Sequence, residues 1–174
     1  MPNPVRTPDA ILLRLLLTLF LVGFALFPGP LSAREVRFSG NEAPGTIVVR
    51  TTERKLYLIV GEGRAVSYPV GVGRAGKQWF GTTSIVRKQV RPAWSPPAEL
   101  RAGRPAWIVP AGAPNNPMGA AALVLADNEL AIHGTNNPGS IGGYVSWGCI
   151  RMHNKDIMQI YDRVTVGTRV ILTR

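Results

Sequence analysis

The residue types with the clearest chemical potential are the single cysteine, Cys149, and two histidines, His133 and His153. A thiol with a pKa near 8.5 is only about 3% ionised at neutral pH, so a cysteine nucleophile needs a base beside it. An imidazole can accept the thiol proton and leave a thiolate–imidazolium pair. His133 lies sixteen residues before Cys149 and His153 lies four residues after it, so both histidines are candidate bases.

The segment between His133 and Cys149 could bring the two side chains together. A strand that ends at His133, a connection with three glycines among residues 139–143, and a return to Cys149 would place imidazole and thiol side by side. Gly134 allows a tight turn beside the imidazole, and its carbonyl could orient the second ring nitrogen. Because no acidic residue lies between His133 and Cys149, a third member would be a main-chain oxygen. These features favour His133 as the base and leave His153 as the alternative.

The neighbours of Cys149 suggest how a substrate could be held. Gly148 gives the backbone freedom, so that its N–H and that of Cys149 could converge on the oxyanion of a tetrahedral intermediate. Arg151 would share a face with Cys149 in an extended segment, and its guanidinium would suit a substrate carboxylate. The alternative interpretation of Arg151 is an internal ion pair with Asp156.

The segment from Ser146 to Arg151 reads Ser-Trp-Gly-Cys-Ile-Arg and follows the His-Gly pair at 133–134. This arrangement resembles the catalytic signature of the L,D-transpeptidase family, whose catalytic module is often called the YkuD-like domain. The resemblance extends to Trp-Ser-Pro-Pro at 94–97, to Asn-Pro-Met-Gly at 116–119 and to the opening strand pair, and so covers nearly all of residues 45–173. Trp147 is a departure, because many relatives carry His there, and this puts in doubt any contribution of a second histidine near the thiol.

The resemblance implies roles for individual residues. Cys149 would be the nucleophile, His133 the base and Gly134 the carbonyl partner. We expect the substrate to be contacted by Arg151, Ser146, Thr135 and Trp147. The implied reaction is attack of the thiolate on the carbonyl of the third residue of a peptidoglycan stem tetrapeptide, with release of the terminal D-alanine and transfer of the thioester to an amine.

The same resemblance implies partners. The amine would belong to the third residue of another stem peptide or to a lysine of an outer-membrane lipoprotein. A carbapenem would acylate Cys149, and an envelope thiol reductant would protect it from oxidation. Residues 91–119, which contain seven prolines, are our candidate for one wall of an acceptor groove that excludes water. The alternatives are an L,D-carboxypeptidase that uses water as acceptor and a non-catalytic wall-binding module.

The elements that must position these residues are mainly strands. Short runs rich in β-branched residues, separated by turn signals, lie at 46–50, 55–60, 65–72, 82–90, 123–125, 130–133 and 169–172. One helix is expected after Cys149, where apolar residues recur at helical spacing and Asn154 can serve as the cap. We therefore predict a mainly β fold, a mixed β-sandwich or barrel like that of L,D-transpeptidases, with one short helix after the cysteine.

The first part of the chain is predicted to be a leader. Residues 1–33 contain a basic start, an apolar run at 15–27, helix-breaking residues and a small-residue cleavage site at 31–33, the pattern of a secretory signal peptide. An uncleaved anchor is the alternative. Residues 34–45 are expected to be a flexible lead-in and 46–174 the catalytic domain. The sequence thus predicts an exported protein of the periplasm or cell envelope.

Composition narrows the possible ligands. The net charge is +10, but the basic runs are interrupted by apolar residues without an aromatic stacking pattern, so nucleic acid is not predicted as a partner. An exported basic protein is better suited to meet an anionic polymer or membrane face. Cys149, His133 and His153 could supply three metal ligands, but no carboxylate-backed histidine pattern accompanies them. We expect no metal and no cofactor.

Overall fold

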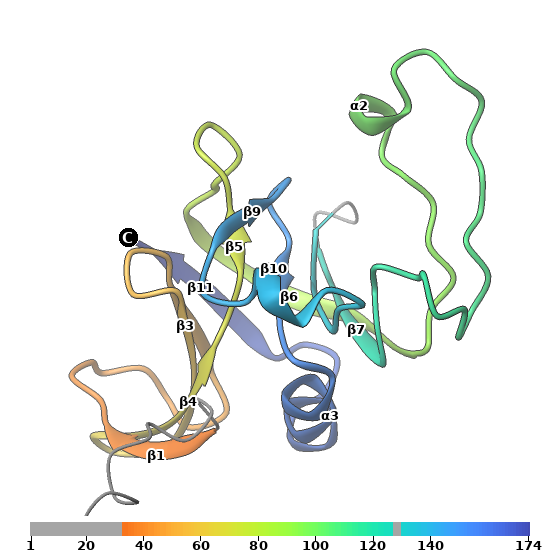
Figure 1. Ribbon diagram of the computed structural model, residues 1–174. Coiled ribbons are helices and arrows are strands. Elements are labelled where there is room, and N and C mark those ends of the chain that lie inside the picture. Colours follow the sequence, from red (N-terminus) through yellow and green to blue (C-terminus); the bar gives the residue numbers. More distant parts are fainter. Residues whose placement is uncertain (1–32, 127–129) are drawn as a thin grey trace, which may run out of the picture. The chain divides into compact units, whose positions relative to one another are not determined.

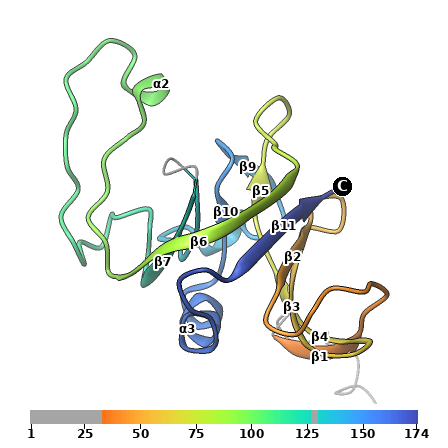
Figure 2. The ribbon, with the colours of Figure 1, turned by 180° about the vertical axis from the view of Figure 1, so that it is seen from behind.

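The computed structural model describes residues 33–126 and 130–174 (Figure 1). Residues 1–32 of the predicted signal peptide and the turn at Asp127-Asn128 lie outside the described residues. Most of the described strands form one nine-stranded sheet in the order β1-β4-β3-β2-β11-β6-β7-β8-β10, and β5 pairs with β9 in a second, two-stranded sheet (Figures 1 and 2). In the described part of the chain, no helix is long and apolar enough to span a membrane.

Every run predicted as a strand forms one. The strands are β1 (Arg34–Arg37), β2 (Ile47–Arg50), β3 (Lys55–Gly61), β4 (Arg64–Pro69), β5 (Val72–Gly73), β6 (Gly81–Val90), β7 (Ala121–Leu125), β8 (Ala131–His133), β9 (Tyr144–Ser146), β10 (Ile150–Arg151) and β11 (Arg169–Thr173). The mainly β fold is therefore confirmed. The sequence did not indicate β1, β9 and β10.

The strands β2, β3 and β4 form an antiparallel meander that is buried on both faces. Ile47 and Val49 point into the main core, whereas Val48 belongs to a second, smaller cluster on the opposite face. Phe38 belongs to this second cluster and lies just after β1, which pairs with β4. Part of the segment predicted as a flexible lead-in is thus a strand that leads into a buried aromatic residue, because the continuous apolar run of β2 needs cover on its second face.

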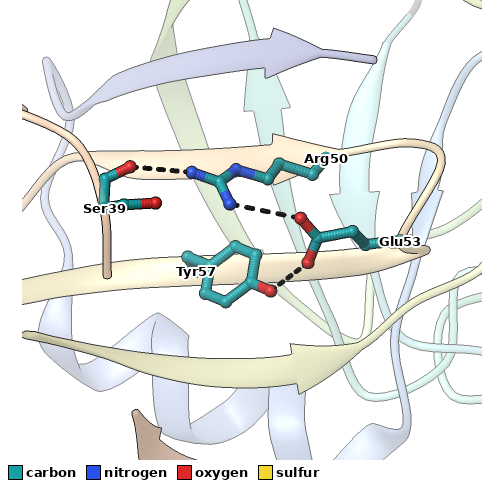
Figure 3. A network of polar contacts seen from close by, with 4 residues as sticks. All are labelled: Ser39, Arg50, Glu53 and Tyr57. Carbon is teal, nitrogen blue, oxygen red and sulfur yellow. Dashed lines mark hydrogen bonds and ion pairs between the residues drawn. The ribbon is translucent and has the colours of Figure 1, made fainter. Parts of the chain in front are cut away.

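Arg50 fastens this N-terminal segment to the sheet (Figure 3). Its guanidinium carbon lies 4.7 Å from the centroid of the Phe38 ring and 5.4 Å from that of Tyr57. The same guanidinium donates hydrogen bonds to the Ser39 carbonyl (3.0 Å) and to Glu53 (3.2 Å), and the Tyr57 hydroxyl donates to Glu53 as well. The contacts join residues 38–39 to the β2–β3 hairpin.

Two parallel pairings make the large sheet mixed. β11 runs parallel to β2 and antiparallel to β6, so it lies in the interior of the strand order. β10 runs parallel to β8, and its other side meets Gly71, whose N–H and carbonyl are hydrogen bonded to Arg151 at 2.9 and 2.8 Å. The chain just after β4 is therefore joined to β10, the last strand in the order.

The predicted helix after the cysteine is α3 (Asn154–Arg163), which packs against β7 and β8 through buried residues that include Ile157 and Ile160. The prediction that Asn154 caps it is wrong: His153 occupies the N-cap position, and no side chain caps the helix. At the other end Lys88 Nζ donates to the carbonyls of Tyr161 (2.6 Å) and Val164 (2.7 Å). A cation is favourable there because helix carbonyls carry partial negative charge.

Residues 91–119 form a structured loop that extends away from the strands in both ribbon views (Figures 1 and 2). It contains the short helix α2 (Ala98–Arg101), which the sequence did not indicate, and a β-bridge between Trp94 and Val109. The buried Asn116 joins the two ends of this loop near the strands. The Asn116 amide nitrogen donates to the carbonyls of Pro92 (2.8 Å) and Pro110 (3.0 Å).

Candidate active site

The parallel pair β8–β10 gathers the residues predicted to do chemistry. Ile150 is opposite Ile132 and Arg151 is opposite His133 in this register. Extending the register by one residue places Cys149 beside Ala131, and a hydrogen bond from the Ala131 backbone acts to lower the pKa of the thiol. Arg151 and His133 are register partners and so share a side of this pair, and alternation along an extended chain puts Cys149, just before β10, on that side as well.

His133 is held by main-chain oxygens. The side chain is only 4% exposed, and Nδ1 lies 2.6 Å from the carbonyl oxygen of Gly134. Burial lowers the pKa of His133 to about 4, with the nearby charge of Arg151 acting in the same direction and the carbonyls of Gly134 and Pro117 acting against it. The predicted Gly134 carbonyl is therefore at the ring, and Pro117 is a second carbonyl near it that the residue types did not indicate.

Cys149 is partly exposed, whereas its base candidate is buried. Burial of the sulfur raises the pKa of Cys149, although the Ala131 backbone and the charge of Arg151 partly oppose this. With the pKa of the imidazole lowered and that of the thiol raised, both groups are neutral near pH 7. Burial of the two groups thus disfavours the thiolate–imidazolium pair expected from the sequence.

The turn before Cys149 is held by Ser146. The Ser146 hydroxyl donates to the carbonyl of Cys149 (2.5 Å) and accepts from the N–H of Gly148 (3.1 Å). Gly148 has φ = 125°, a conformation open to glycine, and a Cβ there would lie 2.8 Å from Leu130. Ser146 is buried, so its geometry favours a positioning role, and its contact with substrate remains a prediction.

Two tryptophans make contacts at this turn that the sequence did not indicate: Trp147 lies within the turn, and Trp79 reaches it from a distant part of the chain. The Trp79 indole N–H donates to the carbonyl of Gly148 (3.1 Å). The predicted substrate residue Trp147 is half-buried, and its ring meets Arg74 and Lys77, whose charged atoms lie 3.4 and 4.8 Å from the ring centroid.

Asn154 supports the strand end that carries His133. Its side-chain oxygen accepts the N–H groups of Ala120 and Thr135, and its amide nitrogen donates to the Thr135 carbonyl, each at 3.0 Å. A Cβ on Gly134 would lie 2.2 Å from the same oxygen, so glycine is required for space. Thr135 is buried in these contacts, which favours a positioning role, and its contact with substrate remains a prediction.

The structure also bears on the alternative roles that the sequence left open for Arg151 and His153. The ion pairs among the described residues include none between Arg151 and Asp156; Arg151 Nε and both Asp156 oxygens are buried there without a hydrogen-bond partner. Within residues 33–126 and 130–174, no group of three or more His, Cys, Asp or Glu side chains could hold a metal ion. His153 instead precedes α3 and acts electrostatically on Asp156.

A family model described as the L,D-transpeptidase catalytic domain, YkuD, matches residues 44–172. The chain belongs to the L,D-transpeptidase family. This confirms the resemblance seen in the Ser-Trp-Gly-Cys-Ile-Arg segment.

Known L,D-transpeptidases give the extent of the similarity. The chain is 42% identical over 135 residues to the probable L,D-transpeptidase YbiS of Escherichia coli K12, covering 71% of this chain and 43% of that protein. It therefore spans less than half the length of this curated relative. The crystal structure of L,D-transpeptidase 3 from Mycobacterium tuberculosis has a TM-score of 0.60 at 14% identity, over 74% of this chain and 60% of that one. The structure of LdtMt1 in complex with imipenem has a TM-score of 0.54 at 14% identity. This match covers 74% of this chain and 58% of that one. The two structures show a shared fold.

Proposed function

We propose that the protein is a murein L,D-transpeptidase in which Cys149 is the nucleophile and His133 the general base. The observation that carries the proposal is the register of β8 and β10, which gives the partly exposed thiol and the buried imidazole a common face. Because the Gly134 carbonyl engages Nδ1 of His133, the other ring nitrogen is left to accept the thiol proton.

The proposed reaction has two halves. In the first, His133 takes the thiol proton while the sulfur attacks the carbonyl carbon of the third residue of a stem tetrapeptide. The C–N bond to the terminal D-alanine then breaks, His133 returns the proton to the departing amine, and a thioester remains on Cys149. In the second half an acceptor amine attacks the thioester, His133 takes its proton, and the thiol is re-formed by that proton.

The oxyanion of each tetrahedral intermediate needs hydrogen-bond donors. We assign this role to the N–H groups of Cys149 and Gly148. The Gly148 N–H donates to the Ser146 hydroxyl at 3.1 Å in the resting structure, so it has to be shared with, or released to, the oxyanion when substrate is bound.

The proposal also covers the acceptor amine, the cellular location of the protein and the reductant that keeps the Cys149 thiol reduced. The acceptor amine belongs to the third residue of a second stem peptide or to a lysine of an outer-membrane lipoprotein. We propose that the protein is exported to the periplasm, where an envelope reductant keeps its single thiol reduced. Since the solved LdtMt1 structure is a complex with imipenem, we also propose that a carbapenem acylates Cys149.

The decisive test is a product assay with purified protein and muropeptides that carry tetrapeptide stems. Mass spectrometry should find dimers joined by a new amide bond together with released D-alanine. If tripeptides form without dimers, the enzyme is a hydrolase and not a transpeptidase. If the Cys149→Ala variant still forms the products, the thiol mechanism is rejected. His133→Ala should slow acylation about 10²–10⁴-fold, as expected for a lost general base, with His153→Ala as the matched histidine control. A reversed order of these two variants would reject His133 as the base.

Imipenem gives an independent check on the thiol. The intact mass of the protein should rise by one adduct after exposure, and the Cys149→Ala variant should keep its mass. An unmodified wild-type protein would speak against an activated Cys149.

A further inference from the structure

Arg74 and Trp147 form a stacked pair close to the nucleophile. The Arg74 guanidinium carbon lies 3.4 Å from the centroid of the Trp147 ring, the separation of two groups in direct contact. Trp147 is two residues from Cys149, so their Cα atoms are at most about 7.6 Å apart. A peptide bonded to the sulfur would therefore extend into the neighbourhood of this pair.

The backbone around the pair is fixed. The Arg74 N–H donates to the Ser146 carbonyl (3.0 Å), which anchors the residue before Trp147. Further along the same turn, the Gln78 amide donates to the Gly73 carbonyl (2.9 Å) and the Trp79 indole donates to the Gly148 carbonyl (3.1 Å). These bonds fix the backbone of residues 73–79, which carries Arg74, against the turn that contains Trp147.

The two cations at Trp147 differ in their availability. Lys77 forms an ion pair with Glu99 of α2 at 2.7 Å, so its charge is already matched. Arg74 is exposed and takes part in none of the ion pairs among the described residues. A guanidinium that stacks flat on an indole keeps the N–H groups at its edge for other partners, and its fork geometry matches a carboxylate.

We propose that Arg74, held flat on Trp147, binds a carboxylate of the peptide substrate and is a specificity-determining residue. This inference rests on the proposed transpeptidase function and adds a second cationic subsite to it. Arg151 differs, since it lies on the face shared with His133 and its Nε is buried. The carboxylate has two possible sources: the terminal carboxylate of the donor's D-alanine, or a carboxylate of the acceptor stem.

Binding to the Cys149→Ala variant, in which no reaction occurs, separates these sources. In the donor arm, calorimetry compares a stem tetrapeptide that ends in D-alanine with the same peptide ending in D-alaninamide. In the acceptor arm, it compares stem acceptors with free and with amidated carboxylates. One arm should show binding about ten-fold weaker for the amide, the size of one hydrogen-bonded contact to a charged group. Equal affinities in both arms would overturn the proposal.

Substitutions then locate the effect. Adding Arg74→Gln should abolish the preference for the carboxylate, and Arg74→Lys should retain part of it, because charge remains while the fork is lost. Arg37→Gln removes the same charge from β1, the far end of the strand order from β10, and should leave the preference intact. A preference that survives Arg74→Gln, or that Arg37→Gln reduces equally, would refute the assignment.

The contact between Arg74 and Trp147 predicts that substitutions of the two residues have coupled effects on carboxylate binding. Trp147→Ala should weaken carboxylate binding, and the loss should not add to that of Arg74→Gln, because both changes remove one subsite. Additive losses would show that the two residues act separately and would overturn the stacked subsite. Failure of the proposed function would be seen elsewhere, as absent muropeptide products and an unmodified thiol after imipenem, whereas the binding comparison would still report on Arg74.

Discussion

Asn154 provides the sharpest test of how the site is held. Its side chain makes three hydrogen bonds of 3.0 Å to the backbone, two through the oxygen and one through the amide nitrogen. A neutral hydrogen bond contributes about 0.5–1.5 kcal/mol, and solvent access at this exposed residue favours the lower half of the range. Asn154→Ala should therefore lower the free energy of unfolding by about 1.5–3 kcal/mol, or the melting temperature by roughly 6–12 °C for a domain of this size.

The assay is thermal unfolding followed by circular dichroism, with turnover measured well below the melting temperature. Asn136→Ala is the matched control, because Asn136 donates a single hydrogen bond, to the Asn115 carbonyl at 3.0 Å, and should cost at most about 1 kcal/mol. Turnover of Asn154→Ala should fall about ten-fold, since the residue after Gly134 loses its anchor and His133 loses its orientation. A melting temperature within 2 °C of the control would refute this account.

Three other predictions concern charges. Lys88→Met should destabilise the protein by about 2 kcal/mol in urea unfolding, because the carbonyls of Tyr161 and Val164 at the end of α3 lose their donor; an unchanged midpoint would contradict this. Burial raises the pKa of Asp156, so the folded state keeps its proton longer than the unfolded state, and stability falls as pH rises through the folded pKa. Asp156→Asn should accordingly raise the melting temperature at pH 7 and change it little at pH 3; a lower value at pH 7 would reject the assignment. The pKa of His133 is lowered from 6.5 to about 4, so the unfolded state binds more protons in this window and stability is lost as pH falls from 6.5 to 4, by about 3 kcal/mol in total. His133→Gln should flatten that part of the stability–pH curve, and an equal slope in both proteins would exclude His133 as its source.

The strands that the sequence predicts are those with a local signature. β2, β3 and β6 are runs rich in apolar and β-branched residues that are bounded by turns, and such runs are recognisable without knowing their partners. β10 has only two residues, and it exists because β8 and Gly71 lie on its two sides. β1 has a single apolar residue, Val36, and is held by pairing with β4. These strands depend on partners distant in sequence.

The candidate site likewise combines features with a local sequence signature and features that depend on distant contacts. The prediction that Cys149 and His133 lie together rests on a strand end, a glycine-rich connection and a return, all of which are visible in the residue types. Asn154 was misread because an asparagine before an apolar periodic run is typical of a helix cap. Its actual partners are 19 and 34 residues away and are reached only when α3 packs on β7 and β8. The contact of Arg74 with Trp147 is equally non-local.

The place of β11 has a consequence for how the molecule matures. Of the described strands β11 comes latest in sequence, yet it is inserted between β2 and β6 and joins the meander to the strands beside Cys149 and His133. Until residues 169–173 have been synthesised and delivered, the two halves of the sheet have no common strand. Pairings this distant in sequence also form slowly. We therefore expect Cys149 to become reactive only after residues 169–173 have paired with β2 and β6.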